Sequence, residues 1–133
     1  MKDLPGVAMN RDELMYNLAQ VIASDAALVL NGWKHLVLVS VIEAGTPDMT
    51  GFAYLADGRA IPVSPTDFGI FDVLEQLRDA MAAADRREPW VAALFRIDRA
   101  SGNLTAEFEY KRPERWMVTP ENGKERAKEF APG

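Results

Sequence analysis

Cysteine is absent from this 133-residue chain, and histidine occurs only once. Without thiols the protein cannot form disulfides, use a thiol nucleophile or build the zinc sites that depend on thiolates. A single histidine also excludes the histidine-rich sites that hold many catalytic metals. The lack of cysteine is consistent with a reducing compartment.

Long apolar runs are missing as well. Apolar stretches such as Ala26–Leu30 and Leu36–Val39 are far too short to cross a bilayer, and the N-terminus lacks the apolar stretch of a signal peptide. We therefore expect a soluble cytoplasmic protein without membrane contact. Hydrophobic residues make up 48% and charged residues 26% of a chain that no linker or repeat divides, which predicts a single globular domain.

Basic residues are too few to balance the acidic ones, and the net charge is −5. Residues 1–110 hold sixteen acidic and nine basic residues, whereas residues 111–133 hold four and six. An acidic body repels phosphates, so we do not expect nucleic-acid binding. It would attract a basic protein partner, although the same charge also keeps a protein soluble.

The first half of the chain predicts a helix followed by three strands. Asn10 and Glu13 have the spacing of a capping box, and apolar residues follow at helical spacing over residues 11–29. The β-branched composition of Trp33–Glu43 is typical of a strand. Gly45–Asp48 should then turn the chain, and Asp57-Gly58 should join two shorter strands, Gly51–Ala56 and Arg59–Val63.

A second helix and a hairpin are predicted next. Ser64, Thr66 or Asp67 could cap this helix, and Glu88-Pro89 should end it. Its apolar stripe consists of Ile70, Phe71, Val73, Leu74, Leu77, Ala80, Met81 and Ala84. The hairpin strands are Trp90–Asp98 and Asn103–Tyr110. In the last strand Leu104, Ala106, Phe108 and Tyr110 share one face, while Thr105, Glu107 and Glu109 share a face that should be wet.

This element order predicts an α+β fold. We expect an antiparallel sheet of about five strands, formed by a three-strand meander and a hairpin, with two helices packed on one face. Residues 1–9 should be a loose lead-in. Residues 111–133 form a charged tail that contains Pro113 and Pro120, with room for a short helix near Glu121–Phe130.

No catalytic set emerges from the residue types. His35 lies inside a predicted strand; it is either a structural side chain or a general base that needs a carboxylate beside it. Ser40, Ser64 and Ser101 lack the neighbours of a nucleophile, and the glycines at 51, 58 and 102 belong to turns rather than to a phosphate loop. We predict no catalytic residue, metal or cofactor.

Candidate partner-binding residues come from two acidic faces and one tryptophan. Asp72, Glu75 and Asp79 lie along the second helix, and Glu107 and Glu109 alternate on the last strand. Both faces could be solvated surfaces or could contact a basic partner. Trp116, in the charged tail, either packs that tail onto the body or contacts another chain.

The second hairpin resembles the YezG-like immunity (antitoxin) family. The shared pattern is Pro89-Trp90 before an alternating strand, a Gly-containing turn, and the acidic and aromatic residues of Leu104–Tyr110. The initial amphipathic helix and the strand that opens at Trp33 also fit this family. The resemblance implies a small bacterial cytosolic protein that binds and neutralises a cognate secreted toxin, often a nuclease.

Three functions remain open from the sequence. The leading hypothesis is a stoichiometric binding protein, an immunity protein that covers a basic toxin with its acidic surface. The first alternative is a small-ligand-binding or hydrolytic enzyme that uses His35 with a nearby carboxylate. The second is a homodimeric scaffold subunit, which an exposed Trp116 at a two-fold interface would favour.

Overall fold

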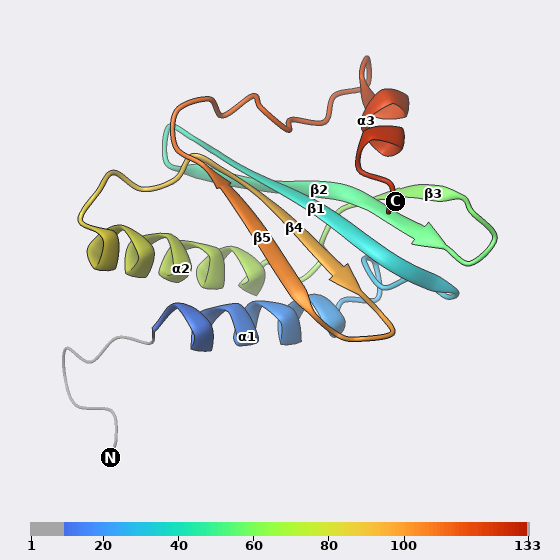
Figure 1. Cartoon of the computed structure of the whole chain (residues 1–133), viewed down its shortest axis with the longest axis horizontal. Coiled ribbons are helices and arrows are strands. Elements are labelled where there is room, and N and C mark those ends of the chain that lie inside the picture. The colour runs from blue at the N-terminus through green and yellow to red at the C-terminus, as the bar shows by residue number, and fades with distance from the viewer. Residues whose placement is uncertain (1–9, 133) are drawn as a thin grey trace.

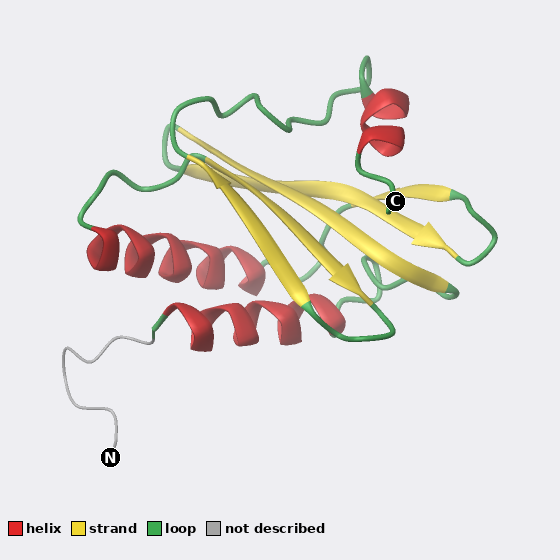
Figure 2. Cartoon of the chain, in the orientation of Figure 1, coloured by secondary structure: helices red, strands yellow, loops and turns green. Residues whose placement is uncertain are grey.

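The computed structural model describes residues 10–132, which form three helices and five strands (Figures 1 and 2). The predicted lead-in of residues 1–9 lies outside this range. The elements, in chain order, are α1 (Arg11–Ala23), β1 (Trp33–Glu43), β2 (Thr46–Leu55), β3 (Ala60–Val63), α2 (Gly69–Asp85), β4 (Ala92–Asp98), β5 (Leu104–Glu109) and α3 (Gly123–Glu129). None of the described helices is both long and apolar enough to cross a membrane.

The five strands form one antiparallel sheet with the order β3-β2-β1-β4-β5. Helices α1 and α2 lie side by side under one face of the sheet, and the segment that carries α3 crosses the opposite face (Figure 1). The predicted α+β architecture, with its meander, its hairpin and two helices on one face, is therefore confirmed.

Helix α1 begins as predicted and ends six residues earlier. The capping box is present: the Glu13 N–H donates to Asn10 Oδ1 at 2.9 Å, and the Asn10 N–H donates to Glu13 Oε1 at 3.0 Å. After Ala23 the chain leaves the helix because the Asp25 carboxylate accepts the N–H of Ala27 at 3.0 Å. Such a side-chain turn competes with the next helical turn.

The Asp25 carboxylate joins the end of α1 to the start of α2. It is only 4% exposed and accepts the Thr66 N–H at 2.7 Å, the Thr66 hydroxyl at 2.8 Å and the Asp67 N–H at 3.0 Å. Burial by itself would raise the pKa of Asp25, but these donors outweigh it and hold the pKa below the usual 3.8. Thr66 therefore donates to Asp25. It is not the cap of α2, although it is one of the three predicted candidates.

The start of α2 is held by Asp67, one of the three predicted caps. Its Oδ1 accepts the Gly69 N–H at 2.9 Å, whereas the N-cap residue itself, Phe68, makes no capping bond with its side chain. The helix ends at Asp85, three residues before the predicted stop, because Arg86 takes a left-handed conformation with φ of 52°.

Strand β1 has the predicted bounds, but β2 begins five residues before the predicted Gly51. The turn is a two-residue hairpin turn at Ala44 and Gly45, whose φ values of 51° and 79° suit this tight connection. Pro47 then pairs with Ile42, whose own N–H donates to Val91 on its other side at 2.9 Å. The N–H of Ile42 thus points away from β2, and the pairing with Pro47 does not need the backbone N–H that proline lacks. Strand β2 can therefore start at Thr46.

Gly51 lies in the middle of β2 and not in a turn, which corrects the sequence interpretation. The two strands approach so closely there that a Cβ atom would overlap the Val37 carbonyl group of β1. Gly51 is therefore required for the backbone approach between β1 and β2.

Both faces of β1 are buried. Leu36, Leu38 and Ile42 join the core under α1 and α2, whereas Val37, Val39 and Val41 belong to a second core on the opposite face. The C-terminal segment completes that second core with Trp116, which is 5% exposed, and with Phe130. Residues 111–132 are thus part of the packed structure.

Glu109 fixes the start of this C-terminal segment. Its carboxylate accepts the Lys111 N–H at 3.0 Å and the Arg112 N–H at 3.2 Å, and it pairs with the Arg115 guanidinium at 3.1 Å. The backbone bonds from Lys111 and Arg112, with the charge of Arg115, lower the pKa of Glu109 from 4.5 to about 2. The prediction of a wet face is therefore wrong for Glu109, whose side chain is 13% exposed, and correct for the exposed Glu107.

Replacing Asp25 by Asn should lower the free energy of unfolding by about 1–3 kcal/mol at pH 7, because the amide NH₂ group would face N–H donors. The folded-state pKa of Asp25 is depressed, so its stabilisation is present above about pH 4 and is lost as the pH falls through that pKa. Urea unfolding at pH 7 and pH 3 should show the difference between wild type and variant shrinking at pH 3. Asp79→Asn on the exposed face of α2 is the control, and equal effects of both substitutions at pH 7 would contradict the assignment.

Glu109→Gln should loosen the start of the C-terminal segment. Because the pKa of Glu109 is depressed, its contribution is complete above about pH 4.5 and declines as the pH falls toward 2. Amide hydrogen exchange at Lys111 and Arg112 should become about tenfold faster in the variant at neutral pH. Glu107→Gln, two residues away on the same face of β5, should leave these rates unchanged, and matching rates in the two variants would refute the anchor.

Candidate functional site: an acidic surface around α2 and the β1–β2 hairpin

The predicted acidic residues of α2 share one exposed face. Asp72, Glu75 and Asp79 follow one another at intervals of three and four residues, while Ile70, Leu74, Leu77 and Met81 pack the opposite side of the helix against the sheet. Among residues 10–132, none of the three carboxylates has an ion pair or a side-chain hydrogen bond. Their charges are available to a partner.

The turn between β1 and β2 meets this acidic face. Gly45 and Pro47 line a small hollow of about 150 Å³ together with Glu75 and Asp79. Arg78 also lines it, but its Nε donates to the Trp90 carbonyl at 2.7 Å, which holds the guanidinium group against the body. The acidic face of α2 therefore continues onto the tip of the hairpin.

Two more carboxylates lie on the other side of the same hairpin. Glu43 ends β1 and Asp48 stands in β2, both exposed and both without an ion pair or side-chain hydrogen bond to any described residue. The register places them at diagonal positions, since Val41 pairs with Asp48 and Glu43 pairs with Thr46. Sequence reasoning missed Asp48 because the early Pro47 marked a turn and hid the alternation of Thr46, Asp48 and Thr50.

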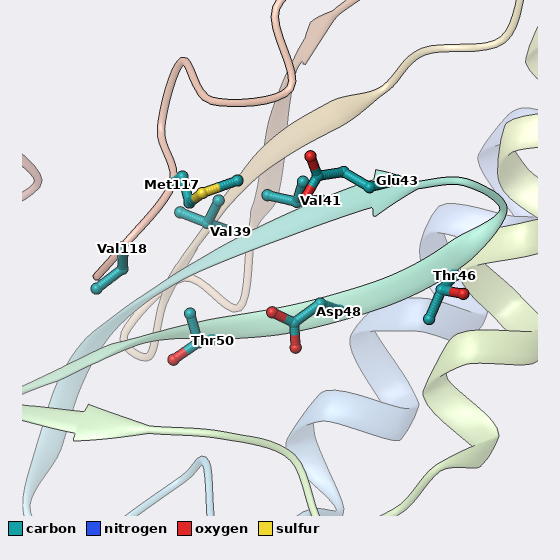
Figure 3. A pocket seen from close by; sticks show the side chains of 8 residues that line it. All are labelled: Val39, Val41, Glu43, Thr46, Asp48, Thr50, Met117 and Val118. Atoms are coloured by element: carbon teal, nitrogen blue, oxygen red, sulfur yellow. The ribbon is translucent and has the colours of Figure 1, made fainter. Parts of the chain in front are cut away.

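A trough of about 360 Å³ begins at these carboxylates and runs along the sheet (Figure 3). Val39, Val41 and Glu43 of β1 lie along one side of the hairpin ladder, and Thr46, Asp48 and Thr50 of β2 lie along the other. Met117 and Val118 of the C-terminal segment complete the lining. The hollow is therefore apolar toward Val39, Met117 and Val118 and acidic toward the hairpin turn, where Asp48 pairs with Val41 and Glu43 follows.

The remaining predicted partner residues do not join this surface. Glu109 is occupied by the C-terminal segment, because it accepts hydrogen bonds from the backbone N–H groups of Lys111 and Arg112 and from the Arg115 guanidinium group. Trp116 is buried in the second core, with the Arg115 guanidinium 4.5 Å from its ring centroid. Of its two predicted roles, Trp116 therefore has the packing role. Glu107 is exposed on the edge strand, two residues from Glu109.

An aromatic pair at the start of α2 has one exposed ring, that of Phe68, which the sequence analysis did not single out. Phe68 is 73% exposed and stacks on Phe71 with ring centroids 6.1 Å apart. Asp72 follows one turn after Phe68 on the same helix. Large aromatic side chains beside polar residues are typical of protein-binding hot spots. The missed signal was a phenylalanine two positions before the apolar stripe.

His35 lies apart from the acidic surface, at the other end of β1. Its Nδ1 is 3.5 Å from Asp98 Oδ1, and the Ser101 hydroxyl donates to Asp98 Oδ2 at 3.3 Å. A hollow of about 560 Å³ includes all three residues. The carboxylate stands between the serine and the histidine, whereas a Ser-His-Asp triad needs the imidazole in the middle. Within the described range, no three His, Asp or Glu side chains converge as metal ligands.

No protein-family model matches this chain, and no curated protein matches it either. A functional assignment therefore depends on the geometry above, and the similarity to the YezG-like immunity family stays a prediction.

Proposed function

We propose that this protein is a stoichiometric binding protein, an immunity protein that neutralises a cognate bacterial toxin with a basic surface. The observation that carries the proposal is the acidic surface formed by Asp72, Glu75 and Asp79 with Glu43 and Asp48. None of these five carboxylates has an ion pair or a side-chain hydrogen bond to a described residue. The protein thus presents negative charge at this end of the fold, whereas Asp25 and Glu109 are occupied by hydrogen bonds within the chain.

A basic toxin is the partner that such a surface would bind fastest. Nucleases handle phosphates and tend to present basic clefts, and complementary charge raises the association rate and makes it sensitive to salt. The exposed Phe68 supplies an apolar anchor beside the acidic residues, which charge alone would not provide. The resemblance of Glu88–Tyr110 to YezG-like proteins supports the same role.

A ligand-binding or hydrolytic role at His35 is the second candidate. It is favoured by the half-open hollow that contains His35, Asp98 and Ser101. It has less support than the binding role, because the hydroxyl and the imidazole are joined only through Asp98. The homodimer hypothesis expected an exposed Trp116 at a two-fold interface. Trp116 is instead buried within the chain, so this support is absent.

Affinity capture from the native cells at low salt should yield one basic protein in a 1:1 complex that dissociates at high salt. Expressed alone, that partner should arrest growth, and co-expression of this chain should restore it. A clean monomer without a partner, or a partner that is harmless to cells, would refute the immunity role.

Neutralising the acidic face of α2 should slow association with the captured partner. The triple variant Asp72→Asn, Glu75→Gln, Asp79→Asn should lower the association rate constant about tenfold at low salt and flatten its salt dependence, with little change in stability. The matched control removes three exposed charges elsewhere, with Glu107→Gln, Glu114→Gln and Glu121→Gln. Equal slowing in both variants would show a general charge effect and contradict a specific surface.

A further inference from the structure

We propose that the trough between the β1–β2 hairpin and the C-terminal segment binds an arginine side chain presented by the partner protein. The inference deepens the proposed function, on which it rests, by assigning a chemical identity to one contact. It concerns a different set of residues from the acidic face of α2.

The half of the trough beside the C-terminal segment suits an aliphatic chain. Val39 and Val41 form its floor on β1, and Met117 and Val118 of the C-terminal segment stand beside them (Figure 3). The Thr50 hydroxyl, also on the lining, already donates to the Val63 carbonyl at 3.2 Å. A volume of about 360 Å³ accommodates a long side chain that enters from solvent.

The end of the trough suits a cation with several donors. Glu43 and Asp48 occupy diagonal positions of an antiparallel ladder, where Cα atoms are typically about 7–8 Å apart. Within residues 10–132 neither carboxylate has a cationic partner, so both can accept hydrogen bonds from a ligand. A single guanidinium group lying between them can donate to both at once.

An arginine side chain fits these two features better than a metal ion or an anion does. Its three methylene groups can lie on the apolar floor while its planar head presents five donors in a fixed geometry. A bare metal ion would find only two carboxylates, because no three ligating side chains converge in the described part of the chain. An anion would be repelled by both Glu43 and Asp48.

The trough lies close to the acidic face of α2, on the other side of the same hairpin. The hairpin turn at Ala44 and Gly45 separates it from the hollow that Glu75 and Asp79 line on the helix side. One basic partner that wraps the hairpin tip would therefore reach both places. An arginine in the trough would set the orientation of this complex, since the α2 face offers charge without a recess of comparable volume.

Titration with the peptide acetyl-Gly-Arg-Gly-amide, followed by methyl NMR, tests the site. The methyl signals of Val39, Val41, Met117 and Val118 should shift together and saturate with a Kd on the order of 1 mM. The citrulline peptide, which has the same shape without the charge, should bind at least about tenfold more weakly. Equal shifts with both peptides, or no shifts at these four residues, would overturn the proposal.

Two double variants test which carboxylates bind the arginine peptide. Glu43→Gln with Asp48→Asn should weaken the arginine peptide about tenfold or more, whereas Glu75→Gln with Asp79→Asn should leave its Kd within about twofold. All four positions are exposed, so both variants should fold, and circular dichroism checks this. If the same methyl signals shift when the protein alone is concentrated, a second copy occupies the trough and the proposal fails.

The captured partner separates this inference from the proposed function. If the double variant Glu43→Gln, Asp48→Asn binds and neutralises the toxin with the affinity of the wild type, the arginine site is overturned and the immunity role stays intact. A positive peptide titration without any toxin partner would support the arginine site and refute the immunity role.

Discussion

The fold depends on the burial of both faces of β1. From Leu36 to Ile42 every residue of this central strand is buried, and its side chains alternate between two cores. Helices α1 and α2 cover one face, and an uncovered second face would leave Val37, Val39 and Val41 in water. The C-terminal segment is therefore as necessary to the sheet as the helices are. It packs against this face through Trp116 and Phe130.

The way in which this segment covers the sheet creates the candidate site. It leaves β5 at Glu109, crosses the sheet with Met117 and Val118, and is held on the far side by the Tyr54 hydroxyl, which donates to the Ala127 carbonyl at 2.6 Å. The turn of the β1–β2 hairpin and the start of this segment lie at the same end of the sheet (Figure 1). Glu43 and Asp48 remain exposed there because no described segment packs over them.

The carboxylates of this acidic chain have different roles because of the donors around them. Asp25 is buried among N–H and hydroxyl donors and joins two helices. Glu109 lies against the N–H groups of the segment that follows it. The carboxylates of α2 and of the hairpin tip have no such donors among the described residues, so binding a cationic partner does not require a structural bond to be broken first.

Local pattern was enough to determine the elements and their order. The capping box of α1, the bounds of β1 and the apolar face of β5 follow from spacing that acts over a few residues, and so does the acidic face of α2. Tertiary structure decided the rest. Asp25 joins α1 to α2 because its donors Thr66 and Asp67 lie about forty residues away in sequence, Gly51 stands in a strand because Val37 approaches it, and Trp116 is buried because the second face of β1 needs cover. The trough joins a hairpin to a segment some seventy residues later, and no local pattern encodes that contact, because it arises only when the sheet has two covered faces.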